Sequence, residues 1–158
     1  EALRAARAED IPGILALLAP LEAEGILVPR SHEQLERDID QFAVMVRDGL
    51  VIATHAVHDY PEEGLAELAC VAVHPQYRGS QRAATLLIRA ERQARRRGID
   101  RLFVLTTQTP HWFLEQGFTQ ASVEDLPPAR RETYNAARRS VVMMKSLKKA
   151  RRPDVKHP

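Results

Sequence analysis

The sequence predicts one α/β (α+β) domain in which helices flank a central mixed sheet. The chain has 158 residues, of which 44% are hydrophobic, enough for one core and too few for two comfortable domains. Apolar residues recur at helical spacing in some segments and form short β-rich runs in others. These segments follow one another in the order ααβββαβαβαβ, with no internal repeat or low-complexity linker.

Two helices are predicted first. Asp10 is the expected N-cap of one helix, because Pro12 follows in the first turn and apolar residues continue at helical spacing to Leu21. Ser31 and Gln34 have the spacing of a capping box, which marks the start of the second helix. The apolar face predicted for this second helix consists of Leu35, Ile39 and Phe42.

A hairpin and a third strand are predicted next. Residues 43–57 contain two β-rich runs separated by Asp48 and Gly49, a pair that tolerates the positive φ angles of a tight turn. Residues 65–74 form a third apolar run, which ends before Pro75. We therefore expect three consecutive strands before the next helix.

Helices and strands alternate in the C-terminal half. A helix is predicted from Arg82, and a buried strand of the parallel type at residues 101–107. A short helix around residues 111–116 and a helical stretch from Pro127 come next. The strand at residues 140–145 is expected to close the sheet.

Composition and charge exclude several classes of protein. The sequence has no run of 18 uninterrupted apolar residues and no secretory signal, so a soluble cytoplasmic protein without membrane contact is predicted. The single cysteine, Cys70, excludes an intrachain disulfide and gives no support to a zinc site. The formal charge of +2 depends on residues 148–158, a basic tail without stacking aromatics, so nucleic-acid binding is not expected.

Residues 74–87, HPQYRGSQRAATLL, predict an anion-binding turn. An apolar run leads into a turn with Gly79 and then into a helix, whose first N–H groups lie unpaired at the positive end of the helix dipole. Arg78 and Arg82 add two full charges, which suit a pyrophosphate. The segment lacks the Gly-Lys-Ser/Thr of a P-loop and the three glycines of a dinucleotide fingerprint. By spacing alone, an ordinary turn with solvated arginines explains it equally well.

Four separated segments carry a resemblance to known acetyltransferases. LEAEGILVPRS, AELACVAVHPQYR, FVLTTQTPHWFLEQGF and YNAARRSVVMMK occur in this order in the sequence. Together they resemble the GNAT acetyltransferase superfamily over residues 3–147 and, within it, the acetyltransferase domain of the bacterial N-acetylglutamate synthase family. The domain is thus expected to cover residues 1–147, followed by the basic tail. The resemblance also implies an N-terminal amino-acid-kinase-like domain in the natural protein, and a homo-oligomer is compatible with it.

The resemblance implies acetyl-coenzyme A as co-substrate and no metal. In this family the cofactor's pyrophosphate binds the turn before the helix, and its thioester lies between two splayed parallel strands, here residues 66–74 and 101–107. Gln81 stands where the family usually has a second glycine, and Phe113 stands where many members have a tyrosine that protonates the leaving thiolate. The residues implied for cofactor binding are Val71, Ala72, Val73, Arg78, Gly79, Ser80, Gln81, Arg82, Ala83 and Phe113.

The implied acceptor is L-glutamate, which would be acetylated on its α-amine to N-acetyl-L-glutamate, the first step of arginine biosynthesis. Two carboxylates require forked guanidinium donors and a hydroxyl, and Arg30, Arg138 and Ser140 fit this demand. By spacing alone, each arginine is more simply explained as a solvated surface side chain. The residues implied for substrate binding are Val28, Arg30, Cys70, Leu105, Thr106, Arg138 and Ser140.

Glu67 is the predicted general base. It is the one carboxylate in an apolar strand, where burial makes a carboxylate a stronger base; the alternative is a strand-edge glutamate facing solvent. Backbone N–H groups near Cys70 and Val71 are expected to hold the oxyanion. Cys70 is expected to have a raised pKa and to line the pocket, which favours direct attack in a ternary complex over a covalent acetyl-cysteine. Tyr134 is the candidate proton donor to the leaving thiolate.

Two alternatives to this function stay open. A GNAT enzyme for another amino acid or a protein amine would have the same cofactor site with a different acceptor. A catalytically weak, regulatory module that binds acetyl-coenzyme A would be consistent with Gln81 and Phe113. Turnover with glutamate as sole acceptor separates these cases.

Overall fold

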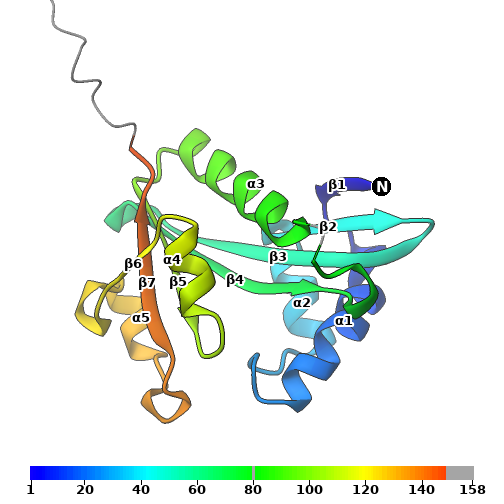
Figure 1. Ribbon diagram of the computed structural model, residues 1–158, viewed down its shortest axis with the longest axis horizontal. Coiled ribbons are helices and arrows are strands. Elements are labelled where there is room, and N and C mark those ends of the chain that lie inside the picture. Colours follow the sequence, from blue (N-terminus) through cyan, green and yellow to red (C-terminus); the bar gives the residue numbers. More distant parts are fainter. Residues whose placement is uncertain (80, 149–158) are drawn as a thin grey trace, which may run out of the picture.

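A mixed seven-stranded sheet forms the centre of the molecule (Figure 1). The computed structural model describes residues 1–79 and 81–148, and the strand order within them is β1-β2-β3-β4-β5-β7-β6. Ser80 and all of the predicted basic tail except Lys148 lie outside the described residues. The strands are β1 (Ala2–Ala5), β2 (Phe42–Arg47), β3 (Leu50–Tyr60), β4 (Leu65–Val73), β5 (Arg101–Thr106), β6 (Thr119–Gln120) and β7 (Val141–Ser146). The helices are α1 (Ile11–Ala23), α2 (His32–Asp38), α3 (Arg82–Arg96), α4 (Pro110–Glu115) and α5 (Pro128–Glu132).

Helices cover both faces of the sheet. Leu87 and Ala94 of α3 pack with Phe113 of α4 against β4 and β5. Ile14 of α1 and Leu35 of α2 belong to a separate apolar cluster with β2 and β3, on the face away from α3 (Figure 1). The sheet is therefore the middle layer of a helix–sheet–helix arrangement, as the sequence predicts.

The predicted capping box of α2 and the predicted start of α3 are both confirmed. Ser31 Oγ accepts the N–H of Gln34 over 3.1 Å, and Gln34 Oε1 accepts the N–H of Ser31 over 2.8 Å, so the predicted capping box is present. Helix α3 begins at Arg82 as predicted. The placement of Phe42 on the second helix is wrong. Phe42 is the first residue of β2, opposite Ala56, because pairing with β3 satisfies its backbone while its side chain becomes buried.

Asp10 differs from its prediction as well. Its carboxylate accepts the N–H of Arg7 over 2.8 Å and forms an ion pair with Arg4 at 2.8 Å, and it makes no cap hydrogen bond to α1. The Arg4 hydrogen bond lowers the pKa of the Asp10 carboxyl from its ordinary value. Asp10 therefore ties β1 to the entrance of α1, while Pro12 occupies the first turn as predicted.

The predicted hairpin is present, whereas the two edges of the sheet differ from the prediction. The hairpin of β2 and β3 turns at Asp48 (φ 51°) and Gly49 (φ 79°), as predicted. Strand β1 was not predicted, because its four residues, ALRA, include no β-branched or aromatic side chain. The expectation that β7 closes the sheet is wrong, since β7 lies between β5 and the short edge strand β6.

Strands β4 and β5 diverge along their length. Their parallel register runs from Leu65 opposite Arg101 to Glu67 opposite Phe103. Beyond Glu67, β4 continues to pair with β3 as far as Val73. The splayed parallel pair implied by the resemblance is thus confirmed, and the opening between the two strands positions the site described next.

Candidate active site

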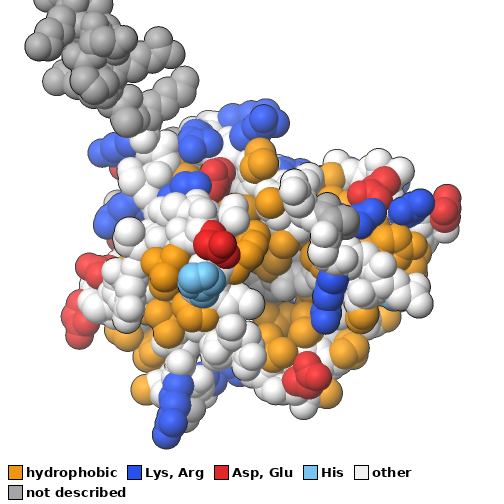
Figure 2. All heavy atoms as spheres, viewed as in Figure 1, with side chains coloured by type: hydrophobic (Ala, Val, Ile, Leu, Met, Phe, Trp, Pro, Cys, Tyr) orange, Lys and Arg blue, Asp and Glu red, His pale blue; other side chains and the backbone are white. Residues whose placement is uncertain are grey.

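The opening between β4 and β5 is a cavity of about 490 Å³. Its lining includes β4 from Leu68 to Val73, the end of β5 at Thr106, and Trp112 and Phe113 of α4. Figure 2 shows the molecule hollowed near the middle of the view, with hydrophobic side chains around the hollow. A deep and largely apolar cavity with a few polar groups is the usual form of a small-molecule site.

A β-bulge lies in the wall of this cavity. Ala56 pairs with Ala69 and Thr54 pairs with Ala72, so Cys70 and Val71 together oppose the single residue between them on β3. Cys70 has a φ of 55°, which costs a residue other than glycine about 1–3 kcal/mol. Such local strain is typical of functional sites. Here the bulge redirects the peptide groups that are expected to hold an oxyanion.

A second cavity, of about 510 Å³, lies at the N-terminus of α3. Gly79, with a φ of 83°, and Gln81, with a φ of 63°, shape the turn before the helix, and Gln81 is the N-cap residue. Ala83 lines this cavity as well as the one between the strands. The first N–H groups of α3 can therefore bind an anion whose remaining part extends toward β4.

Arg78 and Arg82 lie beside this turn in different environments. Arg78 is exposed and donates from Nε to the carbonyl oxygen of Val73 over 3.2 Å. Arg82 forms an ion pair with Glu1 at 2.8 Å, donates to the carbonyl oxygen of Tyr77 and lies over the Tyr77 ring. Both arginines line the second cavity.

A third cavity, of about 280 Å³, lies on the other side of the bulge. We call it the acceptor pocket. Three arginines and one carboxylate give it a net positive lining. The described residues that line it are Ile26, Leu27, Val28, Arg30, Glu67, Leu68, Ala69, Cys70, Leu105, Thr107, Arg130, Thr133, Tyr134, Asn135, Arg138 and Ser140.

The acceptor pocket brings together nearly all the residues implied for substrate binding. Thr106 is the exception. It lines the cavity between the strands, and its Oγ1 accepts the N–H of Thr109 over 3.1 Å. Cys70, Leu105 and Thr107 line both cavities, which are therefore contiguous at the bulge.

The polar residues of the acceptor pocket differ in their partners. Arg138 donates from Nη2 to the carbonyl oxygens of Gly25 (3.3 Å) and Ile26 (3.0 Å). The hydroxyl of Tyr134 donates to the carbonyl oxygen of Ser140 over 3.3 Å, so the candidate proton donor is engaged within the pocket wall. The backbone N–H of Arg30 donates to Glu22 Oε2 over 3.1 Å.

Glu67 lies in the acceptor pocket and is buried, with 7% of its surface exposed. This excludes the alternative of a strand-edge glutamate facing solvent. Its carboxylate forms an ion pair with Arg130, with Nε and Oε1 2.8 Å apart. Sequence reasoning missed Arg130, because 63 residues separate the two partners and no local pattern connects α5 with β4.

Cys70 is buried and has the environment that its sequence context predicts. Burial raises the pKa of its thiol to about 11, a shift that the nearby Arg30 opposes and Glu67 increases. A thiol with such a pKa is almost entirely protonated at neutral pH and is a poor nucleophile. The role of Cys70 as a lining residue is consistent with this environment.

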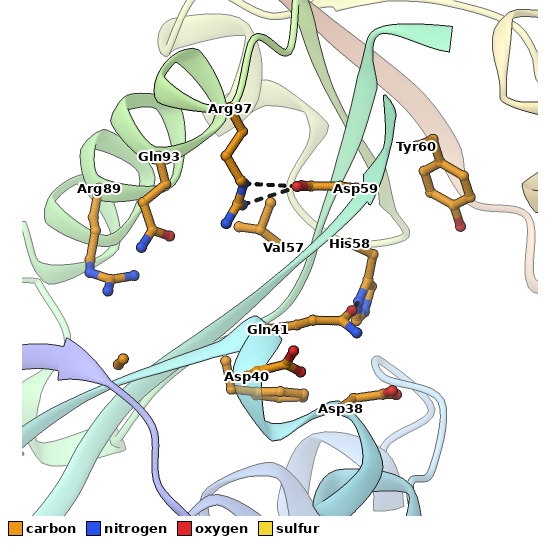
Figure 3. Close-up of a pocket in the computed structure, with 12 residues that line it drawn as sticks. Asp38, Asp40, Gln41, Val57, His58, Asp59, Tyr60, Arg89, Gln93 and Arg97 are labelled. Atoms are coloured by element: carbon orange, nitrogen blue, oxygen red, sulfur yellow. Dashed lines mark hydrogen bonds and ion pairs between the residues drawn. The ribbon is translucent and has the colours of Figure 1, made fainter. Parts of the chain in front are cut away.

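A further cavity, of about 570 Å³, lies elsewhere, between α3 and the end of β3 (Figure 3). The ion pair of Arg97 with Asp59, at 2.7 Å, crosses it, and His58 contacts Gln41 at its far side. It contains no residue implied for binding or catalysis. The three cavities around β4 and α3 therefore form the candidate active site.

The described residues contain neither a cluster of metal ligands nor a helix suited to a bilayer. No group of three or more His, Cys, Asp or Glu side chains within residues 1–79 and 81–148 is arranged to hold a metal ion. Across the same residues, every helix is too short or too polar to span a bilayer.

Comparisons with known proteins agree with this geometry. The chain matches the acetyltransferase (GNAT) family over residues 12–118. It is 53% identical over 147 residues to an amino-acid acetyltransferase of Mannheimia succiniciproducens, and 51% identical over 147 residues to one of Vibrio cholerae. These alignments cover 93% of this chain but 34% and 33% of the two relatives, so the chain spans about a third of their length.

A solved structure gives the same result for the fold. N-acetylglutamate synthase from Neisseria gonorrhoeae, complexed with coenzyme A and N-acetyl-glutamate, superimposes with a TM-score of 0.90 at 40% identity. The superposition covers 94% of this chain and 35% of that protein. The predicted fold and the predicted resemblance are thereby confirmed: the chain belongs to the acetyltransferase (GNAT) family.

Proposed function

We propose that this chain transfers the acetyl group of acetyl-coenzyme A to the α-amine of L-glutamate. One observation carries the proposal. A pocket with Arg30, Arg138 and Ser140 in its lining adjoins the cavity between the splayed strands, and Glu67 lies in it. Two guanidinium groups and a hydroxyl match an acceptor with two carboxylates. The relatives described as amino-acid acetyltransferases, and the neisserial enzyme complexed with N-acetyl-glutamate, support the same assignment.

The proposed cofactor site combines the other two cavities. The N-terminus of α3, with Gly79, Gln81 and the two arginines beside it, would bind the pyrophosphate of acetyl-coenzyme A. The pantetheine arm would extend along β4 past Val73 and Val71, so that the thioester reaches the bulge. No metal takes part in the proposed reaction.

The proposed reaction is direct attack in a ternary complex. Glu67 removes a proton from the ammonium of glutamate, directly or through water, and the free amine attacks the thioester carbon. The oxyanion that forms is held by backbone N–H groups at the bulge, near Cys70 and Val71. The nitrogen loses its second proton to solvent, the carbon–sulfur bond breaks, and the thiolate of coenzyme A takes a proton from solvent or from Tyr134. The products are N-acetyl-L-glutamate and coenzyme A.

The whole protein is expected to be larger than this chain. Because the curated relatives are about three times as long, we infer that the natural protein contains at least one more domain, of the amino-acid-kinase-like type that the resemblance implies. We further propose that the protein is cytoplasmic and that it can form a homo-oligomer.

The proposal is tested by measuring the release of free coenzyme A with each amino acid in turn as the acceptor. We expect turnover with L-glutamate and none with lysine-containing peptides. Turnover with another amino acid or with peptides would support an enzyme with a different acceptor. Tight binding of acetyl-coenzyme A without any turnover would instead support a regulatory module.

A further inference from the structure

Arg130 differs from the other two arginines of the acceptor pocket in what it contacts. Its Nε lies 2.8 Å from Glu67 Oε1, and its Nη2 lies 3.5 Å from Glu67 Oε2. Its Nη1 donates to Thr133 Oγ1 over 2.8 Å. Thus all three guanidinium nitrogens are engaged, two of them with the side chain that we propose as the general base.

We propose that Arg130 is a positioning residue for Glu67, and that Thr133 holds Arg130 in place, so that α5 and its C-terminal turn orient the general base of the reaction. The inference rests on the proposed function of Glu67 and goes beyond it, because it assigns a role to a helix outside the cofactor site. Figure 1 places α5 beside β7, on the side of the sheet away from α3.

Burial makes this contact more than a surface ion pair. The Glu67 side chain is 9% exposed and that of Arg130 is 21% exposed, so both lie largely out of water. A buried carboxylate has several rotamers and no bulk solvent to orient it, so its direction depends on its partner. Exposed ion pairs of the same type contribute little to protein stability, whereas a largely buried ion pair fixes the positions of its two side chains.

The geometry also distinguishes the two carboxylate oxygens. Oε1 makes the short contact with Nε, while Oε2 makes only the long contact with Nη2. Oε2 is therefore the oxygen that remains available to accept a proton from the acceptor's ammonium. Arg130 would keep Oε1 occupied during the reaction and prevent the carboxylate from rotating.

Thr133 supports Arg130 from the C-terminal end of α5. Its Oγ1 accepts from Nη1 of Arg130 and donates to the carbonyl oxygen of Arg130 over 3.1 Å. This short loop of hydrogen bonds fixes the direction of the Arg130 side chain on its own helix. Arg30 also lines the acceptor pocket, and no hydrogen bond or ion pair joins its side chain to the described residues, so its guanidinium has donors left for a ligand.

Several other titratable groups lie around Glu67. His58 is opposite Glu67 in the β3–β4 register, and burial lowers the pKa of His58, so it is neutral at pH 7. Tyr60 of β3 and Cys70 of β4 have raised pKa values, mainly through burial, and are neutral as well. Arg130 of α5 is the cation in contact with Glu67, and Arg30 is a second cation in the same pocket.

Steady-state kinetics of Arg130 variants test the proposal, with coenzyme A release as readout. For Arg130→Gln we expect kcat to fall by up to about a hundredfold, with little change in the KM for glutamate, because the base is misplaced while the acceptor is still bound. Arg130→Lys, which keeps a positive charge beside Glu67, should restore part of kcat. Thr133→Val should lower kcat in the same direction by a smaller factor.

Arg131→Gln is the matched control, since Arg131 is the exposed neighbour of Arg130 on α5 and its guanidinium donates to the carbonyl oxygen of Glu124. It should have the kinetics of the unmodified chain. If Arg130→Gln raises the KM for glutamate and leaves kcat unchanged, Arg130 binds the substrate and the proposal is overturned. A kcat of Arg130→Gln equal to that of the unmodified chain also overturns it. If Arg130→Gln does not fold, Arg130→Lys and Thr133→Val decide by the same criteria.

The outcome for the unmodified chain separates this inference from the proposed function. If the unmodified chain acetylates a different acceptor, the assignment to glutamate fails, and the same comparison with that acceptor still tests Arg130. If the chain turns over glutamate but Arg130→Gln retains its kcat, only the role of Arg130 fails.

Discussion

Arg138 donates from Nη2 to the carbonyl oxygen of Ile26 over 3.0 Å, although 112 residues separate them in the sequence. The bond joins the segment after α1 to the segment before β7. Both segments contribute to the acceptor pocket, which therefore exists only in the folded chain. A second bond from Arg138 Nη2 to Gly25 strengthens this connection.

Arg30→Ala should weaken binding of glutamate selectively. A guanidinium that bonds a carboxylate contributes about 1.5–3 kcal/mol, or about ten- to a hundredfold in affinity. We expect the KM for glutamate to rise by this factor while that for acetyl-coenzyme A stays the same. Arg37→Ala, an exposed arginine on α2, is the control. Equal increases in both KM values would contradict a role in holding the acceptor.

Glu67→Gln should reduce turnover without preventing binding. The amide has the shape of the carboxylate but cannot accept the ammonium proton, so kcat should fall by about two to four orders of magnitude. Binding of acetyl-coenzyme A, measured by calorimetry, should be unchanged. Glu63→Gln, at an exposed position, provides the control. Turnover close to that of the unmodified chain would remove Glu67 from the mechanism.

Cys70→Ala should retain most of the turnover. The raised pKa of the Cys70 thiol, about 11, leaves almost no thiolate at neutral pH, so no acetyl-cysteine should form. Mass spectrometry of the chain incubated with acetyl-coenzyme A alone should detect no added acetyl group on Cys70. An acetylated Cys70 peptide, together with an inactive variant, would indicate a two-step transfer.

Gln81→Gly should stabilise the fold. Gln81 has a φ of 63°, in the left-handed region, where a side chain costs about 1–2 kcal/mol and glycine costs nothing. Because glycine loses more entropy on folding, we expect a net gain of up to about 1 kcal/mol, and a Tm higher by about 2–4 °C. Gly79→Ala, at a φ of 83°, should lower the Tm. A lower Tm for Gln81→Gly would show that the glutamine side chain makes a stabilising contact that outweighs the strain.

His55 should make the fold less stable in mild acid. His55 is 1% exposed, and burial lowers its pKa to about 4, with Arg89 adding to the shift. Between pH 6.5 and about 4, the unfolded chain therefore binds a proton that the folded chain does not, so stability decreases as pH falls. The loss should be about 2 kcal/mol between about pH 7 and about pH 5 by urea denaturation. His55→Leu should remove most of this slope, and an unchanged slope would assign it to other groups, such as His58.

Local patterns predicted the elements that local interactions determine. The Asp48-Gly49 turn and the Ser31–Gln34 capping box depend on a few adjacent residues, and both are present. The start of α3 at Arg82 follows from the same kind of signal. The divergence of β4 from β5 came from the family resemblance, since no spacing along one strand determines where its neighbour turns away.

Long-range contacts account for what the sequence did not predict. Phe42 fits a helical apolar pattern but joins β2, because pairing with β3 determines its backbone. Asp10 is a residue type that favours N-cap positions, but its carboxylate forms an ion pair with Arg4 of β1 instead. Arg130 contacts Glu67 only because α5 packs against the sheet. The sequence therefore indicates Glu67 as a candidate base but does not reveal Arg130 as its partner.

The central claim concerns where the two substrates lie, and a crystal structure with coenzyme A and N-acetyl-L-glutamate tests it most directly. We expect the pyrophosphate on the N–H groups at the start of α3, and the acetyl oxygen at the bulge of Cys70 and Val71. The glutamate carboxylates should contact Arg30 and Arg138. Coenzyme A bound in the cavity beside His58, or N-acetyl-L-glutamate bound away from both arginines, would contradict the account.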